Sequence, residues 1–356
     1  MRSNETIRCG LLQTPMKFLR FLLFPFAVIY GWITAVRNLL FDFQLLRGKT
    51  FDVPVISVGN LSVGGTGKTP HVEYLIRTLS ASHRVAVLSR GYKRKSQGFV
   101  LASANSTVAD LGDEPFQYHR KFPQIQVAVD ANRRRGIELL SRSSFQPEII
   151  LLDDAFQHRY VKPDVQILLS TFEQPFFSDF LLPTGNLREY RSGAKRADLI
   201  VITKCPPDLN AQVLASYVSE IKRYSKAEVF FSTVGYAEQT EGDFQLKTSE
   251  LPQLKKAIFT GIAQPNPFVA QILNPTDAVF EFADHHDLTE SERAMIQKSA
   301  DLVVTTEKDY VRVKSVWEKP GLCYLPIQVQ FVDEANFLAA FERKFTKCAA
   351  ILRKRS

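Results

Sequence analysis

Cysteine is scarce in this chain, and no two of its cysteines stand close in sequence. The four are Cys9, Cys205, Cys323 and Cys348, and no Cys-x-x-Cys pair occurs. This spacing excludes a zinc knuckle and a dithiol redox motif. A reducing compartment is the simplest interpretation.

A clean membrane-spanning run is missing as well. The uncharged segment 21–36 has sixteen residues, which at helical rise span roughly 24 Å, less than the ~30 Å hydrocarbon core of a bilayer. Pro25 and Gly31 weaken a straight span further, and no small-residue cleavage site of a signal peptide follows. Apolar residues lie all round this helix, and Tyr30 and Trp32 suit a membrane interface. We therefore expect an interfacial or re-entrant membrane anchor; the alternative is a helix packed on a soluble core.

Internal repeats and low-complexity segments are absent, and the composition is that of an ordinary globular protein. The chain has 356 residues, 45% of them hydrophobic and 23% charged, which is enough for one large domain or two. Its formal net charge of +8 fits anionic partners such as a nucleotide, a nucleic acid or an acidic membrane surface. Solubility alone would explain the charge equally well, so the charge does not choose among them.

Strand and helix patterns alternate along most of the chain. Strands are predicted at Val53–Val58, Arg84–Leu88, Ile125–Val129, Ile149–Leu152, Val165–Leu169, Leu199–Thr203 and Val229–Phe231, with helices at Pro70–Ser80, Arg133–Ser141 and Ala211–Tyr224. Such short, continuous apolar runs are typical of a parallel sheet covered on both faces. The predicted fold class is α/β, with a doubly wound, mostly parallel sheet of the P-loop NTPase type. Its ligands should bind at the carboxyl ends of the strands.

A second, smaller α/β domain is predicted after the polar segment Gly235–Pro252. It would contain strands at Ala257–Thr260 and Leu302–Thr305 and a helix at Phe268–Leu273. The expected division is residues 1–45 as an N-terminal hydrophobic helix, 46–235 as the P-loop core and 236–356 as the smaller domain. An amphipathic basic helix is predicted at Glu334–Lys354, and we expect it to pack back on the core.

The most informative motif is Val53–Thr69, an apolar strand followed by a glycine-rich turn and then Lys68 and Thr69. Backbone N–H groups of such a turn bind phosphate oxygens, the lysine reaches the β- and γ-phosphates, and the Thr69 hydroxyl can ligate Mg²⁺. The predicted nucleotide-binding residues are Ser62, Val63, Gly64, Gly65, Thr66, Gly67, Lys68 and Thr69. The usual pattern G-x-x-x-x-G-K-[ST] has glycine where this chain has Ser62. The motif indicates a bound nucleoside triphosphate.

Two acids follow the apolar run Ile149–Leu152. In P-loop enzymes an aspartate at such a strand end holds Mg²⁺ directly or through water. Asp153 and Asp154 should lie at the same sheet edge as the loop, so we predict a magnesium site made by Thr69, Asp153 and Asp154. Without the upstream loop, a solvated acidic turn would be the simpler explanation.

Other polar residues follow predicted strands or begin helices. Arg90 would stabilise charge on the transferring phosphoryl group, or be a surface arginine beside a turn. Asp113 would be a general base for the acceptor hydroxyl, or only a partner of the helix dipole. Of the three arginines that begin at Arg133, one or two can face an anion. Gln157 and His158 could face phosphates or acceptor, or be satisfied loop residues.

His285 and His286 form a pair in the smaller domain. No further histidine or cysteine stands at a spacing suited to metal binding. An acid–base role is therefore the functional interpretation, and a surface loop is the alternative. A histidine that tunes Asp113 would come from this second domain, which implies hinge closure on binding.

Seven motifs, in this order, resemble one known family. They are S-V-G-N-L-S-V-G-G-T-G-K-T-P, S-R-G-Y, G-D-E-P, D-D-A-F-Q-H, P-T-G-N-L-R-E, V-I-T-K and T-T-E-K-D. Together they resemble the tetraacyldisaccharide 4′-kinases of lipid A biosynthesis, from the N-terminal hydrophobic helix to about Tyr310. Ser62 is shared with that family, whereas Ala155 stands where its pattern has glycine.

This resemblance implies a reaction, cofactors and a location. The reaction is transfer of the γ-phosphate of ATP, with Mg²⁺, to the 4′-hydroxyl of a tetraacylated glucosamine disaccharide 1-phosphate. The enzyme would be a monomer at the cytoplasmic face of a Gram-negative inner membrane, without a nucleic-acid partner. By analogy the base is Asp113, assisted by His285 or His286, and Lys68 and Arg90 complete the predicted catalytic set. The remaining supporting, substrate-binding positions are Glu114, Arg133, His158 and Glu189.

Two other functions remain open on the residues alone. Val201–Lys204 resembles the base-reading strand end of some GTPases and keeps a membrane-associated nucleotide switch open, although Cys205 and two prolines follow it in place of the usual aspartate. A nucleic-acid-stimulated ATPase rests only on the basic charge, since no aromatic–basic patch is present. Transfer of label from ATP to lipid, rather than to free phosphate, would separate the kinase from both.

Overall fold

A computed structural model describes residues 20–206, 208–284 and 286–353 of the chain. The chain divides into two compact units: unit 1 comprises residues 1–90, 130–233 and 331–356, and unit 2 comprises residues 91–129 and 234–330. This division differs from the linear one expected at residue 235, because residues 91–129 belong with unit 2 and the last helix with unit 1. Alternating strand and helix patterns report local structure, but they do not say which unit a segment packs into.

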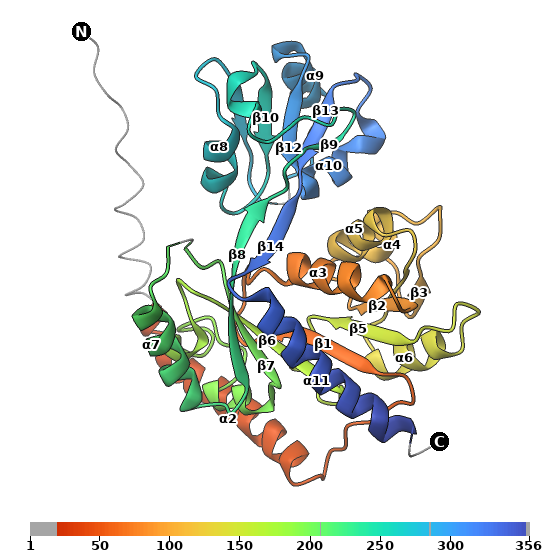
Figure 1. Ribbon diagram of the computed structural model, residues 1–356, viewed down its shortest axis with the longest axis vertical. Helices are drawn as coiled ribbons and strands as arrows, with labels where there is room; N and C mark the ends of the chain where they lie inside the picture. Colours follow the sequence, from red (N-terminus) through yellow and green to blue (C-terminus); the bar gives the residue numbers. More distant parts are fainter. Residues whose placement is uncertain (1–19, 207, 285, 354–356) are drawn as a thin grey trace. The chain divides into compact units, whose positions relative to one another are not determined.

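Unit 1 is built on parallel strands in the order β8-β7-β6-β1-β5-β2 (Figure 1). They are β1 (Val55–Asn60), β2 (Val85–Ser89), β5 (Ile149–Asp153), β6 (Val165–Thr171), β7 (Leu199–Thr203) and β8 (Glu228–Tyr236). Four of them, β1, β2, β5 and β7, are buried along their whole length, as a parallel sheet covered on both faces requires. The predicted α/β fold class is confirmed.

The register of this sheet brings the ends of three strands together. Val58 of β1 lies opposite Asp153 of β5, and Leu88 of β2 lies opposite Leu152 of β5. Because parallel strands end at the same edge, the segments after β1, β2 and β5 emerge side by side. Residues that follow these strands therefore share one candidate site.

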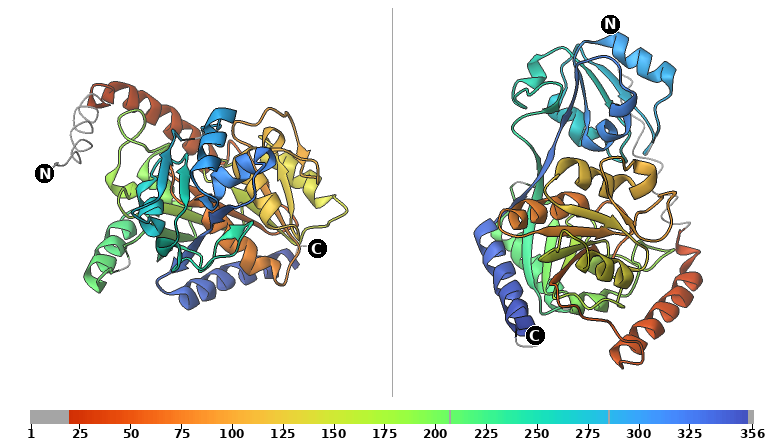
Figure 2. Two further views of the ribbon diagram at one scale, coloured as in Figure 1. Left: turned by 90° about the horizontal axis from the view of Figure 1, so that it is seen from above. Right: turned by 90° about the vertical axis from the view of Figure 1, so that its right-hand side faces the viewer.

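Helices α2 (Phe24–Asp42), α3 (Lys68–Ser80), α6 (Arg133–Ser141), α7 (Ala211–Lys222) and α11 (Glu334–Arg353) belong to unit 1. Figure 2 shows α2 and α11 as long helices on its outside. Phe337 of α11 is buried and stacks on Phe331 with ring centroids 4.0 Å apart. Tyr74 of α3 donates a hydrogen bond from its hydroxyl to Glu334, at 2.7 Å. The last helix thus packs on the P-loop core, as expected from its amphipathic pattern.

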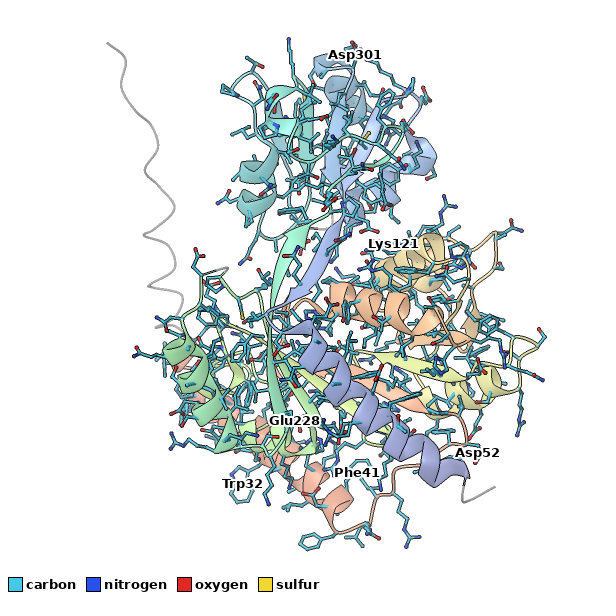
Figure 3. All side chains as sticks on the ribbon, viewed as in Figure 1. Trp32, Phe41, Asp52, Lys121, Glu228 and Asp301 are labelled. Carbon is cyan, nitrogen blue, oxygen red and sulfur yellow. The ribbon has the colours of Figure 1, made fainter. Side chains whose placement is uncertain are left out.

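Helix α2 has one side on unit 1 and another side that is apolar and exposed. Ala27, Gly31 and Thr34 are buried, and the Tyr30 hydroxyl donates to the carbonyl of Arg188, at 2.7 Å. The exposed apolar side chains are Phe26, Ile29, Trp32, Ile33 and Val36, and Trp32 is 69% exposed and projects outward in Figure 3. By length and composition, α2 is the one helix within the described residues that could cross a membrane. Helix α2 is therefore packed on unit 1 along one side and exposed along the other.

Unit 2 holds a second sheet in the order β11-β10-β12-β13-β9. Its strands are β9 (Glu241–Gly242), β10 (Ala257–Thr260), β11 (Ala278–Glu281), β12 (Val303–Thr306) and β13 (Leu322–Leu325), and its helices in this region are α8 (Asn266–Ile272), α9 (Glu290–Ser299) and α10 (Glu307–Val313). Residues 91–129 add β3 (Val100–Leu101), α4 (Val108–Leu111), α5 (Asp113–Lys121) and β4 (Gln126–Val129). The chain enters unit 2 for the second time along β8 and returns along β14 (Ile327–Phe331). The smaller α/β unit was predicted with two strands. Strand β9 has only two residues and β11 is half exposed, so neither shows a clear apolar run, whereas β13 is a buried four-residue strand that the prediction missed.

Candidate functional site

The glycine-rich turn joins β1 directly to α3. Gly64 has φ of 105° and Gly67 has φ of 81°, a left-handed region that side chains disfavour, so both positions require glycine. Ser62 is not in that region; its neighbours Leu61 and Val63 are hydrogen-bonded to the backbone of residues 186–188. Serine is therefore accommodated where the usual loop pattern has glycine.

The loop exposes its glycines and buries its threonine. Gly64 and Gly65 are exposed, Val63 is 37% exposed and Thr66 is buried. Thr203, at the end of β7, donates a hydrogen bond from Oγ1 to the carbonyl of Thr66, at 2.9 Å. The hydrogen bond from Thr203 thus holds one side of the turn, and the side with the two glycines stays exposed to solvent. A phosphate-binding loop needs such an exposed side.

Lys68 is the first residue of α3 and lies between two partners. Its Nζ is 3.3 Å from Oδ1 of Asn60 and 3.8 Å from Oδ1 of Asp154. Asn60 is itself oriented by donating from Nδ2 to the carbonyl of Ser62, at 2.6 Å. The ammonium group is held beside the loop rather than in solvent, which is the position from which a P-loop lysine reaches phosphate.

The two acids after β5 face different neighbours. Asp153 is buried and accepts a hydrogen bond from the Ser89 hydroxyl, at 3.3 Å. Asp154 has φ of 49° and accepts two hydrogen bonds from Nη1 of Arg188, at 3.0 and 3.1 Å. Ala155 has no positive φ, so alanine is tolerated where the family pattern has glycine.

A magnesium ion fits the oxygen ligands at this edge. Thr69 offers a hydroxyl, and Asp153 and Asp154 offer carboxylates at the strand end that lies in register with β1. Magnesium is usually bound by one or two carboxylates plus phosphates and water, so a full protein cage is not required. Within the described residues, no group of three or more histidine, cysteine, aspartate or glutamate side chains is arranged to hold a metal ion.

Arg133 is buried at the start of α6. It donates to the carbonyl of Asp130, at 3.0 Å, and to that of Asp153, at 3.4 Å. Burial lowers the pKa of Arg133 to about 10, partly offset by the charge of Asp153, so the guanidinium stays charged at neutral pH. The next arginines differ: Arg134 is exposed and Arg135 pairs with Asp130, at 2.8 Å. Of the three, Arg133 is the one that donates a hydrogen bond to the end of β5.

His158 lies among positive charges. Burial, and then the charges of Arg133, Arg90 and Arg37, lower its pKa to about 4. Its Nε2 is buried without a hydrogen-bond partner among the described residues. The imidazole is therefore neutral at physiological pH, and an anion is the ligand that the surrounding guanidinium groups would attract.

Glu189 is fully buried and links three segments. It accepts hydrogen bonds from Asn38 of α2 at 2.8 Å, from Gln157 at 3.2 Å and from Arg196 at 2.7 Å. Both carboxylate oxygens are used by these protein groups. The geometry favours a supporting role over direct contact with a substrate.

In unit 2, Asp113 is the first residue of α5 and pairs with α10. Nη2 of Arg312 is 2.9 Å from Oδ2 of Asp113. Gly112 before it has φ of 89°, and an added Cβ there would lie 2.9 Å from the carbonyl of Tyr92, so this turn requires glycine. The G-D-E-P motif is thus a constrained turn that presents Asp113 at a helix start.

Two further ion pairs join the same two helices. Lys308 lies 4.0 Å from Glu114, and Lys121 lies 2.7 Å from Glu307. Of these pairs, the one between Lys121 and Glu307 is largely buried, with 12% and 8% of the side chains exposed. Helix α10, which begins within the T-T-E-K-D motif, therefore holds α5 in place.

The two histidines singled out from the sequence have different outcomes. His285 lies outside the described residues. His286 is 3.0 Å from a carboxylate oxygen of Glu292 and stacks on Phe282 with ring centroids 5.0 Å apart. Hydrogen bonds from Thr289 and then His286 lower the pKa of Glu292 to about 2, so this carboxylate stays charged beside the ring. His286 is thereby fixed within its own unit.

Several residues that shape these sites were not predicted. Arg37, Asn38, Arg188 and Arg196 contribute charge or hydrogen bonds around His158, Asp154 and Glu189 in unit 1, and Arg312 does so at Asp113 in unit 2. Arg37 directly follows the uncharged segment 21–36, which was considered only as an apolar helix. The P-T-G-N-L-R-E motif contains Arg188 and was the one available signal for it.

Comparisons with known proteins identify relatives along nearly the whole chain. A family model described as LpxK, tetraacyldisaccharide-1-P 4′-kinase, matches residues 19–346. A tetraacyldisaccharide 4′-kinase of Flavobacterium johnsoniae is 49% identical over 326 residues, which are 90% of this chain and 96% of the relative. One of Phocaeicola vulgatus is 43% identical over 89% of this chain and 92% of its own length. A crystal structure of LpxK from Aquifex aeolicus in complex with ATP matches with a TM-score of 0.74 at 30% identity, covering 92% of this chain and 99% of that one.

Proposed function

Because the chain belongs to the tetraacyldisaccharide-1-P 4′-kinase family, we propose that it transfers the γ-phosphate of ATP to the 4′-hydroxyl of a tetraacylated glucosamine disaccharide 1-phosphate, a lipid A precursor. One observation carries the nucleotide half of this proposal. Lys68 lies within 3.8 Å of Asn60 and Asp154, beside an open glycine turn at the carboxyl edge of the sheet. This is the arrangement that P-loop phosphotransferases use.

On the nucleotide side, the loop amides and Lys68 bind the phosphates. Thr69 and the acids Asp153 and Asp154 would hold Mg²⁺, which would neutralise charge on the phosphates. Asp154 is held by Arg188 and by Lys68, so its carboxylate is already oriented before ligands arrive. Phosphoryl transfer needs mainly such positioning, because its transition state is loose.

On the acceptor side, Asp113 takes the proton of the attacking hydroxyl. Arg312 binds its Oδ2 at 2.9 Å, which sets the orientation of the carboxylate. Glu114 is a neighbouring supporting acid. Of the two candidate histidines, His286 is already bound by Glu292, which leaves the assisting role to His285.

Arg90, Arg133 and His158 attract the phosphate-bearing ligands. Arg133 is buried and charged, and Arg90 is exposed. A neutral His158 can donate one hydrogen bond to an anion without adding charge. We give Glu189 the separate task of holding Gln157 and Arg196 in place, because its oxygens are occupied.

We infer that helix α2 attaches the protein to a membrane surface. Its outward apolar residues include Ile29, Trp32 and Ile33, each more than half exposed to solvent, which is a poor arrangement for a helix in water. An interfacial helix buries such a face among lipid acyl chains. The proposed acceptor is a lipid, which a membrane-bound enzyme can reach directly. We further propose that the active site lies on the cytoplasmic side of the inner membrane and that the chain is a monomer.

A transfer assay tests the proposed reaction. The full-length protein is incubated with ATP labelled at the γ-phosphate, Mg²⁺ and an acylated disaccharide 1-phosphate in mixed micelles. Label should appear in the lipid, and the Lys68→Ala variant should transfer none. Release of label only as free phosphate would instead support a membrane-associated nucleotide switch.

A further inference from the structure

His71, one turn into α3, is a buried polar residue that the assignments above leave unused. It is 3% exposed. Its Nδ1 is 2.7 Å from the carbonyl oxygen of Gly67, and its Nε2 is 2.9 Å from Oγ of Ser232 on β8. All three residues belong to unit 1. The ring therefore connects Gly67, the last residue before α3, to the middle of strand β8.

The partners decide where the proton on this ring lies. A carbonyl oxygen only accepts hydrogen bonds, so Nδ1 carries the hydrogen and donates it to Gly67. Oγ of Ser232 lies 2.9 Å from Nε2 and carries a hydrogen that it can donate, so Nε2 accepts from the Ser232 hydroxyl. His71 is thus held in one tautomer and one orientation.

The bond to Gly67 has a direct geometric consequence. The peptide between Gly67 and Lys68 is planar and trans, so its C=O and its N–H point in opposite directions. Holding the Gly67 carbonyl with His71 therefore aims the Lys68 N–H away from the ring, toward the open side of the loop. The backbone N–H of His71 also approaches this carbonyl, but at 3.3 Å, so the imidazole makes the shorter bond.

The preceding peptide is held in the same way. Thr203 donates to the carbonyl of Thr66 at 2.9 Å, which fixes the direction of the Gly67 N–H. Two successive loop amides are thus oriented by side chains from behind. Gly67 needs this support, because with φ of 81° and no side chain it has a wide choice of conformations.

The ring is also confined sideways. Phe331 meets it edge-on, with centroids 6.0 Å apart and planes at 89°. Ser232, the other anchor, is fully buried, and its carbonyl accepts from the backbone N–H of Cys205, at 3.0 Å. His71 cannot swing away from Gly67 without leaving the Ser232 hydroxyl unpaired in a dry site, which is costly.

We propose that His71 is a positioning residue for ATP: through its Nδ1–H bond to Gly67 it orients the loop amides that bind the phosphates. Ser232 acts on the loop only through His71. The inference rests on the proposed use of ATP as phosphate donor. It assigns His71 no contact with the nucleotide and no part in proton transfer.

Binding of a non-hydrolysable ATP analogue with Mg²⁺ to the full-length protein, measured by calorimetry, tests this role. His71→Phe keeps the ring but removes the donor, and we expect its Kd to rise about 5- to 30-fold, the equivalent of one lost buried hydrogen bond. His71→Asn restores an N–H near the same place and should return Kd to within about 3-fold of wild type. Ser232→Ala should weaken binding about 2- to 5-fold. His83→Phe, the same change at a histidine beyond the other end of α3, is the matched control and should bind as wild type.

The same series shows what would overturn the proposal. Unchanged analogue binding by His71→Phe would contradict it, and so would His71→Asn binding as weakly as His71→Phe, since then ring shape and not the donor would matter. Should His71→Phe not fold, His71→Asn and Ser232→Ala decide. Weaker binding by Ser232→Ala together with His71→Asn within about 3-fold of wild type supports the inference. Unchanged binding by Ser232→Ala, or a larger loss than about 3-fold in His71→Asn, refutes it. The KM for the acylated disaccharide should stay within about 2-fold in every folded variant. Normal analogue binding by the wild type without phosphate transfer to the disaccharide would contradict the proposed function alone.

Discussion

Arg312 donates a hydrogen bond from Nη2 to Oδ2 of Asp113 at 2.9 Å, although the two residues stand 199 positions apart in sequence. Arg312 also lies 3.7 Å from Asp309, whose Oδ2 accepts the backbone N–H of Gly261 at 2.9 Å. The proposed base is therefore connected, through one guanidinium, to the end of β10. A carboxylate held in this way presents a defined oxygen to its substrate, and positioning of that kind governs much of the rate of phosphoryl transfer.

Removing the guanidinium should lower kcat without weakening nucleotide binding. We expect Arg312→Gln to reduce kcat about 10- to 100-fold with KM for ATP within 2-fold, because only the orientation of Asp113 is lost. Arg312→Lys should recover part of the loss. Lys319→Gln, which removes a surface pair with Asp301 in the same unit, is the control. Steady-state kinetics that show equal kcat for Arg312→Gln and wild type would contradict the positioning role.

Removing the base itself should have a larger effect. Asp113→Ala is expected to lower kcat by roughly 10²–10⁴, again with little change in the KM for ATP. Thermal unfolding of the variant is measured alongside, since loss of the ion pair with Arg312 would also appear there. A folded Asp113→Ala protein with near-wild-type kcat would remove Asp113 from the mechanism.

Glu189 should matter for stability more than its surface counterparts. Glu189→Ala leaves Arg196, Asn38 and Gln157 without their shared acceptor in a buried site, and a broken buried pair costs about 3–5 kcal/mol. Glu228→Ala breaks a surface pair with Arg343 in the same unit and should cost less than about 1 kcal/mol. Urea unfolding of the two variants makes the comparison. Equal losses would show that Glu189 is not the hub its contacts indicate.

Acid should destabilise the protein below the ordinary pKa of histidine. Burial lowers the pKa of His71 from 6.5 to about 4. Between these two pH values the ring is protonated in the unfolded chain and neutral in the folded chain. The stability linked to His71 is complete above pH 6.5 and is lost as pH falls toward 4. Between pH 7 and pH 5 the loss should be about 2 kcal/mol. His158, with its pKa also lowered to about 4, acts in the same direction.

Urea unfolding at pH 7 and pH 5 measures this loss. In His71→Asn the titrating ring is gone, so the difference in unfolding free energy between the two pH values should shrink by about 2 kcal/mol. An unchanged pH dependence in that variant would show that His71 is not the neutral, buried group described here.

The outward face of α2 should control membrane attachment. Ile29→Asp combined with Ile33→Asp places two charges where the native side chains are 58% and 65% exposed. We expect this variant to leave the membrane fraction with ATP binding unchanged, because neither side chain belongs to the nucleotide site. Leu139→Asp, on an exposed apolar position of α6, should remain membrane-bound. Retention of the double variant in the membrane would refute the anchor.

Local signals in the sequence were sufficient for much of the fold and for the nucleotide loop. The apolar run of β1, the glycines and Lys68–Thr69 are adjacent in sequence, and their geometry depends mainly on backbone conformation at Gly64 and Gly67. The acids after β5 were predictable for a related reason. Parallel strands end at one edge, so any residue that follows such a strand is placed near the others.

Tertiary structure alone decided which side chains serve each site. The resemblance gave Glu189 as a substrate-binding position, and only the structure shows its three protein partners. Only the structure brings the charge of Arg37 near His158. The chain order also concealed that residues 91–129 belong to unit 2. Packing between distant segments depends on complementary surfaces, which no local pattern records.

The sequence by itself determined a P-loop α/β protein with an apolar helix in front of it and a set of motifs that names its family. Only the tertiary structure showed how His71 reaches Ser232 across 161 positions and how Arg312 reaches Asp113 across 199. The physical reason is the distance in sequence over which each interaction acts. Backbone conformation and strand direction depend on neighbours in sequence, whereas the orientation of a buried donor or carboxylate depends on partners that only folding brings within hydrogen-bond distance.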